Sequence, residues 1–235
     1  MIGVVGADTG AVTAALEASG TTPHAGPPES IVDSDPEAIV AVGSSAMMSL
    51  ADGGRIPDAP VLAVDAGEGF PDMGSVPDAM AALCAGRYTT VDHPVLRVSV
   101  GGDHAGHAVF DAMVVTGEPG RISEFRITAD ADLGTVRADG IVVATPAGSH
   151  GYARSAGGPR LRPESGAAAV VPVAAFTMSP ERWVVGLDAS VDISSERSVP
   201  LSLLIDDRRT AIADDDSVTA VARESISLVA PNSTA

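Results

Sequence analysis

The sequence predicts an α/β domain followed by a mostly antiparallel β domain. Between Met1 and about Arg87, three apolar segments alternate with helical patterns, which is typical of a parallel sheet covered on both faces. From Tyr88 onward the pattern changes to short β-rich stretches separated by turn residues. The length of 235 residues suits one large or two small domains. We place the domains at 1–87, with the tail 218–235 as a candidate to complete it, and at 88–217.

The first domain begins with a strand, a glycine loop and an Ala-rich helix, which together form one βα unit. Residues 21–36 are rich in Pro, Gly, Ser and acids, and this composition predicts a loop. The other expected elements are strands at 2–5, 37–42 and 61–64 and helices at 47–50 and 79–85.

The second domain is predicted from alternating β-branched residues and from turn signals that contain Gly, Pro and Asp. An acidic turn, Asp206-Asp207, follows one of the last strands. The expected strands are 88–100, 107–115, 124–130, 133–136, 141–144, 170–176, 182–189 and 201–205.

The charge composition is strongly acidic. Asp and Glu number 31 against 14 basic residues, all of them Arg, and the formal net charge is -17. High salt screens the self-repulsion of such a chain, so the Lys-free composition looks haloarchaeal and predicts a halophilic protein. An acidic protein in ordinary salt is the alternative. Because phosphate backbones need Lys and Arg clusters, we expect no nucleic-acid partner.

Disulfides, thiolate metal clusters and membrane spans are not expected. Cys84 is the single cysteine, which excludes an internal disulfide, and no residue spacing predicts a metal site. The longest apolar run, Ala167–Met178, is broken by Pro172 and is shorter than the roughly 20 residues of a membrane-spanning helix. We therefore expect a cytoplasmic protein without a membrane partner.

Two loops follow predicted parallel strands, at the sheet edge where α/β proteins bind ligands. The first is Gly43-Ser44-Ser45-Ala46, which precedes a helix whose N–H groups suit a phosphate. The second begins at Asp65, whose carboxylate can accept hydrogen bonds from hydroxyl groups. A helix-capping turn and a plain strand-to-helix turn explain these loops equally well.

Two further segments carry polar groups in apolar surroundings. Asp111 interrupts an apolar strand, and an ionised carboxylate there requires a partner, either an Arg or a ligand hydroxyl. After the strand at 141–144, residues 145–159 present small and polar side chains together with Tyr152. His150 is either a base or a solvated loop histidine. It does not form a catalytic triad with Ser149 and Asp139, because adjacent Ser and His side chains diverge.

The segment at 139–159 resembles the NAD kinase family, whose motif runs Asp-Gly, strand, Thr-Pro-Thr-Gly-Ser-Thr-Ala-Tyr and Ser-Ala-Gly-Gly-Pro. The matching residues are Asp139-Gly140, Thr145-Pro146, Gly148-Ser149, Tyr152 and Ser155-Ala156-Gly157-Gly158-Pro159. The resemblance implies an N-terminal α/β domain, a C-terminal β domain and a homo-oligomer, either a dimer or a tetramer. It also implies transfer of a phosphoryl group from ATP or polyphosphate to the 2′-hydroxyl of NAD, with Mg²⁺.

The resemblance carries over a nucleotide-binding site. The Gly43 loop would face phosphates, Asp111 would hold a ribose, and Tyr152 and the loop from Thr145 to Ser149 would contact the nucleotide. The full set of binding residues implied for NAD, NADP or ATP is Gly43, Ser44, Ser45, Ala46, Asp65, Asp111, Asp139, Thr145, Gly148, Ser149, Tyr152, Gly157 and Gly158.

The chain departs from the family at the position of its acid. Where the family has Gly-Gly-Asp-Gly-Thr, this chain has Gly43-Ser44-Ser45-Ala46-Met47, so the acid expected to activate the acceptor hydroxyl is replaced by Ser45. Asp65 stands at a family Asn and His150 at a family Thr, and either is a candidate substitute base. Loss of a general base typically costs about 10²–10⁴ in rate.

Three functions therefore stay open. The first is weakened or altered phosphorylation of NAD. The second is a non-catalytic NAD(P)-binding or regulatory paralogue of NAD kinase. The third is a kinase for a different hydroxyl acceptor, such as a lipid.

Overall fold

The computed structural model describes residues 1–52, 55–117 and 122–232. The chain forms two compact units: one contains Met1–His93 and the chain from Ser225 onward, and the other contains Pro94–Glu224. The chain passes between the units within two long strands, β5 (Thr89–Val100) and β16 (Val218–Ala230). The last three residues of the tail 218–235 lie outside the described residues.

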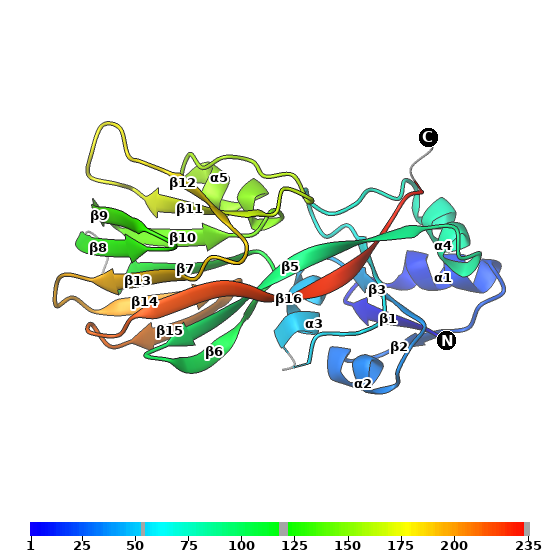
Figure 1. The fold of residues 1–235 in the computed structure, drawn as a ribbon. Helices are drawn as coiled ribbons and strands as arrows, with labels where there is room; N and C mark the ends of the chain where they lie inside the picture. Colours follow the sequence, from blue (N-terminus) through cyan, green and yellow to red (C-terminus); the bar gives the residue numbers. More distant parts are fainter. Residues whose placement is uncertain (53–54, 118–121, 233–235) are drawn as a thin grey trace. The chain divides into compact units, whose positions relative to one another are not determined.

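The first unit is built on a parallel sheet (Figure 1). The strands lie in the order β2-β1-β3-β4, and the end of β16 continues the parallel pairing where Leu228 lies opposite Val61. Apolar residues fill both faces of these strands, which explains why the sequence shows continuous apolar runs here. The strands are β1 (Ile2–Gly6), β2 (Pro23–Ala25), β3 (Ala38–Val42) and β4 (Val61–Val64).

Four helices cover this sheet. On one face, α1 (Gly10–Ala18) and α4 (Val76–Cys84) bury Leu16 and Met80 against the strands. On the other face lie α2 (Pro28–Asp33) and α3 (Ser44–Asp52), and Ile31 of α2 fills the space that a side chain at Gly3 would need (Figure 1).

The expectation of a loop over residues 21–36 is wrong, because this segment contains β2 and α2. Pro28 stands in the first turn of α2, where the missing N–H is not needed, and the buried side chains of Ile31 and Val32 anchor the helix. The helix expected at 47–50 begins earlier, at Ser44, immediately after Gly43.

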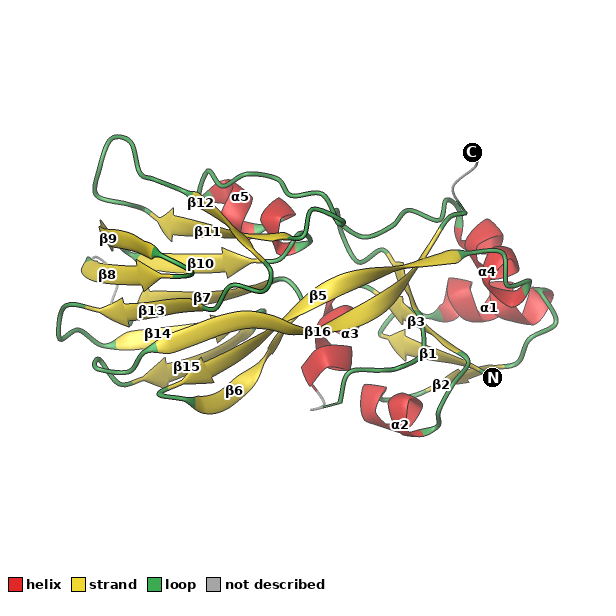
Figure 2. Ribbon diagram, in the orientation of Figure 1, coloured by secondary structure: helices red, strands yellow, loops and turns green. Residues whose placement is uncertain are grey.

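The second unit contains a six-stranded antiparallel sheet and part of a ten-stranded sheet that also includes the parallel strands of the first unit, and Figure 2 shows how strands dominate it. One sheet has the order β12-β11-β10-β7-β14-β15, and the other joins β6 and β5 to β16, β13, β8 and β9. The remaining strands are β6 (Asp103–Ala108), β7 (Asp111–Thr116), β8 (Ser123–Thr128), β9 (Asp132–Ala138), β10 (Gly140–Ala144), β11 (Ala167–Val173), β12 (Trp183–Gly186), β13 (Val191–Ser195), β14 (Leu201–Ile205) and β15 (Arg208–Ile212).

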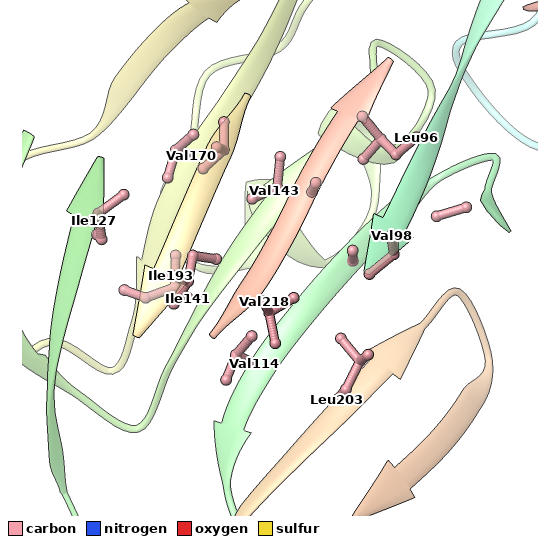
Figure 3. Close-up of a cluster of buried hydrophobic side chains, with 14 of the residues drawn as sticks. Leu96, Val98, Val114, Ile127, Ile141, Val143, Val170, Ile193, Leu203 and Val218 are labelled. Carbon is pink, nitrogen blue, oxygen red and sulfur yellow. The ribbon is translucent and has the colours of Figure 1, made fainter. Parts of the chain in front are cut away.

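A hydrophobic core fills the space between these two sheets (Figure 3). Ile141 and Leu203 contribute from one sheet, and Leu96, Ile193 and Val218 contribute from the other. The opposite face of the β10 sheet is covered by the short helix α5 (Tyr152–Ser155) and by Leu161. The fold is therefore held by apolar burial, and the polar residues of the predicted site lie at strand ends and in connecting loops.

Two expectations for the second unit need correction. The stretch expected at 107–115 is divided between β6 and β7, and the dipeptide Val109-Phe110 links the two strands. Strands β13, β15 and β16 were not expected, because each carries several polar residues.

Candidate functional site

A cavity of ≈ 940 Å³ lies in the first unit, where β1, β3 and β4 end. Five of the predicted binding residues line it together: Gly43, Ser44, Ser45, Ala46 and Asp65. Other lining residues come from the loop after β1 and from the start of α2. The cavity therefore lies at the carboxyl edge of the parallel strands, where the sequence places it.

Gly43 shapes the wall of this cavity. Its φ of 87° lies in the region that favours glycine, and its N–H donates to the carbonyl of Val64 at 2.8 Å. Its own carbonyl accepts the N–H of Ala46 at 3.2 Å, so α3 starts directly at Ser44. The first N–H groups of a helix lack intrahelical partners, so Ser44 and Ser45 offer their backbone to an anion in the cavity.

Two carboxylates share the cavity with the exposed side chain of Ser45. Asp65 follows β4 directly and has a φ of 51°. Asp8 follows β1, and sequence reasoning did not select it as a site residue. Its position after the first parallel strand is the signal that could have identified it, because parallel strands end at one common edge.

In the second unit, Asp111 lies beside Asp206 rather than beside an arginine. In the described part of the chain no ion pair joins Asp111 to an Arg, so the internal Arg partner considered for this carboxylate is not found. Asp206, in the turn between β14 and β15, donates its N–H to the carbonyl of Asp111 at 2.9 Å. Sequence reasoning treated Asp206 only as part of an acidic turn.

This environment changes the acidity of both carboxyl groups. Burial, and then the negative charge of Asp206, raise the pKa of Asp111 to about 7. Burial also raises the pKa of Asp206, although hydrogen bonds from the N–H groups of Val109, Phe110 and Asp111 oppose this shift. Near neutral pH the pair therefore holds a proton that an isolated aspartate would release.

The loop after β10 is built around two buried hydroxyl groups. Thr145 Oγ1 donates to the carbonyl of Val109 at 2.7 Å and accepts the N–H of Gly148 at 3.2 Å. Ser149 Oγ donates to the carbonyl of Pro146 at 2.6 Å and accepts the N–H of Leu161 at 2.8 Å. Both side chains are fully buried, so these hydroxyls hold the loop, and their contact with a nucleotide stays a prediction.

The three glycines predicted in this region allow close packing. A Cβ on Gly148 would overlap the carbonyl oxygen of Phe110. Gly157 has a φ of 85° and lies against the guanidinium group of Arg182. A Cβ on Gly158 would meet Val171 and the carbonyl of Ala153.

The remaining predicted residues lie at different places in the second unit. Tyr152 is exposed at the start of α5, and His150 Nε2 lies 3.2 Å from the carbonyl oxygen of Leu161. Asp139 precedes β10, whereas Asp111 pairs with Ala144 at the other end of that strand. At about 3.3 Å per residue, the strand β10 places Asp139 more than about 15 Å from Ala144, the residue that pairs with Asp111.

Metal ligands and membrane spans are not found among the described residues. No group of three or more His, Cys, Asp or Glu residues there is arranged to hold a metal ion. Within the same ranges, no helix has the length and apolar character needed to cross a bilayer.

Comparison with protein families matches residues 111–227 to the ATP-NAD kinase C-terminal domain. The NAD kinase of Methanopyrus kandleri is 30% identical over 154 residues, which cover 63% of this chain and 56% of that protein. The NAD kinase of Nitrosospira multiformis is 35% identical over 170 residues, covering 68% of this chain and 58% of that protein. The chain thus matches less than two thirds of the length of these relatives.

Solved structures show the same fold. Yeast NADH kinase complexed with NADH superposes with a TM-score of 0.79 at 17% identity, covering 99% of this chain and 84% of that one. An NAD kinase from Archaeoglobus fulgidus in complex with ATP gives a TM-score of 0.76 at 20% identity, covering 100% and 94%. The predicted fold class, α/β followed by antiparallel β, is confirmed.

Proposed function

The chain belongs to the NAD kinase family, and on that premise we propose that it binds NAD or NADP and ATP. We further propose that it transfers a phosphoryl group to the 2′-hydroxyl of NAD with weakened or altered activity. The observation that carries this proposal is the cavity at the start of α3. Ser45 lines this cavity, and the resemblance assigns the family's acid to its position.

The expected loss of rate follows from the chemistry of Ser45. A serine hydroxyl does not accept a proton at neutral pH, and general-base catalysis is worth about 10²–10⁴ in rate. Phosphoryl transfer depends mainly on positioning and on charge stabilisation, so activity without the base is reduced rather than abolished. Asp65 lines the same cavity as Ser45, which favours Asp65 over His150 as the substitute base.

Each unit would contribute its own contacts to the nucleotide. The N–H groups at the start of α3 would receive phosphates, and the carboxyl group of Asp111 would hold a ribose hydroxyl. Tyr152 supplies an exposed aromatic face for a base. Its exposure and the half-buried carboxyl of Asp111 support these assignments.

The Mg²⁺ that the family implies would be held mainly by the nucleotide. The described residues do not offer three grouped ligands for a resident metal. Phosphate oxygens are strong ligands for Mg²⁺, which usually keeps several waters and takes few protein ligands. The chain's own contribution would be to orient the phosphates at the α3 terminus.

A coupled assay tests the proposal. The full chain is incubated with ATP, Mg²⁺ and NAD in molar KCl, and formation of ADP and NADP is followed together with the melting temperature. We expect NAD to raise the melting temperature, since a ligand of the native state stabilises it. Slow formation of NADP would support the proposal. No thermal shift with NAD, NADP or ATP would contradict it.

A non-catalytic NAD(P)-binding or regulatory paralogue is the second candidate. The uncharged Ser45 side chain in the cavity favours it, because binding needs no general base. A thermal shift with NAD but without NADP formation, at any enzyme concentration tested, would support this candidate and exclude the first.

We also propose a homo-oligomer, a dimer or a tetramer. Phe176, Met178 and Val184 in the second unit are exposed by 67%, 102% and 56%, and large exposed apolar side chains often mark protein interfaces. Light scattering on the full chain tests this, and we expect Met178→Asp to shift the mass toward the monomer. A monomeric mass for the wild-type chain would contradict the proposal.

A further inference from the structure

The dipeptide that links β6 to β7, Val109-Phe110, is held by the carboxylate of Asp206. One carboxylate oxygen accepts the N–H of Val109 at 2.9 Å. The other accepts the N–H of Phe110 at 2.8 Å and the N–H of Asp111 at 3.0 Å. Asp206 completes the contact by donating its own N–H to the carbonyl of Asp111. The backbone leading into Asp111 therefore has its donors satisfied by one side chain.

The carbonyl groups of the same dipeptide are held from the loop after β10. Thr145 donates its N–H to the carbonyl of Phe110 at 2.9 Å and its hydroxyl to the carbonyl of Val109 at 2.7 Å. The absence of a side chain at Gly148 allows that loop to reach the Phe110 carbonyl. Both the N–H groups and the carbonyl groups of the dipeptide are hydrogen-bonded, so little freedom remains for the backbone of Asp111.

The carboxylate of Asp206 stabilises the chain link through these three hydrogen bonds, but its charge also carries an electrostatic cost. Its negative charge lies beside a second partly buried carboxyl. Burial, and then this charge, raise the pKa of Asp111, which costs folding free energy near neutral pH. Asp206 adopts a φ of 52°, which Asp tolerates better than most residues other than Gly and Asn. Partly buried pairs of like-charged groups of this kind are concentrated at functional sites.

We propose that Asp206 is a positioning residue, which fixes the Val109–Asp111 backbone so that the Asp111 carboxyl meets the ribose hydroxyl of a bound dinucleotide. The role rests on the proposed function, because it requires that Asp111 binds the ribose. Asp206 does not itself need to touch the ligand. Its effect on binding passes through Asp111, and this makes the role separable from general stabilisation.

The test is a double-mutant cycle on dinucleotide affinity, measured by calorimetry with NAD and the full chain in molar KCl. The variants are Asp206→Asn, Asp111→Asn and the double variant. We expect each single substitution to weaken NAD binding about tenfold or more. Because Asp206 acts through Asp111, the double variant loses no more affinity than Asp111→Asn alone.

Two controls separate positioning from folding. Asp207→Asn removes the neighbouring exposed charge and is expected to keep wild-type affinity within about twofold. Ile193→Val in the core lowers the melting temperature without touching the Asp206 contacts, and its NAD affinity should stay unchanged. If Asp206→Asn does not fold, Asp206→Gly removes the carboxylate while keeping the positive φ.

The outcomes distinguish this role from the proposed function. Wild-type affinity in Asp206→Asn, with affinity lost in Asp111→Asn, overturns the positioning role and leaves the proposed function intact. The positioning role is also overturned if the affinity of the double variant falls by the product of the two single-variant factors. Such a result shows that Asp206 acts independently of Asp111. Wild-type affinity in Asp111→Asn, or no NAD binding by the wild-type chain, overturns the ribose contact itself and the positioning role with it.

Discussion

The N–H of Gly43 donates to the carbonyl of Val64 at 2.8 Å, and this bond ties the end of β3 to the end of β4. Ser45 lies two residues beyond Gly43, and Asp65 lies one residue beyond Val64. One backbone contact therefore brings the substituted position and a carboxylate to the same cavity. The proposed substitute base therefore lines the same cavity as Ser45, the residue that the resemblance sets at the family's acid.

We predict that Asp65→Asn lowers any residual kcat for NAD phosphorylation by about tenfold or more, with a smaller change in KM. The carboxylate is the proposed proton acceptor, and Asn tolerates the φ of 51° at this position. The measurement is steady-state formation of NADP by the variant and the wild type.

His150→Ala is the matched control for that experiment. The His150 ring already lies 3.2 Å from the carbonyl oxygen of Leu161, so its removal should change kcat little. Full activity in Asp65→Asn, or a large loss in His150→Ala alone, would reverse the assignment of the substitute base.

A second prediction concerns pH. The pKa of Asp111 is about 7 in the folded chain and 3.8 ordinarily, so the folded state binds the extra proton between these values. Its contribution to stability is complete below pH 3.8 and is lost as pH rises through about 7. Between pH 5 and pH 8 this group should remove about 2–3 kcal/mol from the free energy of unfolding.

Urea unfolding at the two pH values, in molar KCl, measures this loss. Asp111→Asn supplies the reference, because it keeps the shape of the side chain and removes the titration. We expect the wild type to lose more stability than the variant as pH rises. Equal losses in the two proteins would show that Asp111 titrates at an ordinary pKa.

A third prediction concerns Gly148. A methyl group at this position overlaps the Phe110 carbonyl oxygen, so Gly148→Ala should destabilise the chain by about 3 kcal/mol or more. At Gly10, at the start of α1, nothing lies within 4 Å of such a methyl group, so Gly10→Ala should cost less than about 1 kcal/mol. Thermal unfolding of both variants tests the close approach, which similar melting temperatures would contradict.

A fourth prediction follows from the net charge of -17. Raising KCl from 0.1 to 1 M shortens the screening length from about 10 to 3 Å, which weakens repulsion among the carboxylates. The melting temperature should therefore rise steadily over this range and beyond. A flat or falling melting temperature would identify an acidic protein adapted to ordinary salt.

Much of the fold could be predicted from the sequence because local patterns carry it. The apolar runs that became β1, β3 and β4 and the turn that separates β14 from β15 are short-range signals. Helix α2 was missed because its prolines and acids are typical of loops, and only the tertiary burial of Ile31 reveals it. Strand β2 is three residues long and depends on its pairing with β1.

For the site, too, local signals in the sequence were predictive and long-range contacts were not. The sequence predicts Ser45, Asp65 and Asp111 as site residues because each interrupts or follows an apolar strand, and their roles stay predictions. Asp206 was not identified, since its bonds reach residues that lie 95 to 97 positions earlier, and no periodicity reports such a contact. The loop from Thr145 to Ser149 was assigned a nucleotide contact, which stays a prediction. The structure adds that the Thr145 hydroxyl bonds the carbonyl of Val109 and that the Ser149 hydroxyl bonds Pro146 and Leu161.

The central claim is that the chain keeps a nucleotide pocket but lacks the acid at position 45, and Ser45→Asp tests it most directly. Ser44→Asp is the control, because it adds the same charge to the same helix terminus. NADP formation is measured for both variants at equal NAD occupancy. We predict that Ser45→Asp raises kcat by at least tenfold and that Ser44→Asp does not. A wild-type kcat in Ser45→Asp, or an equal increase in both variants, would contradict the account.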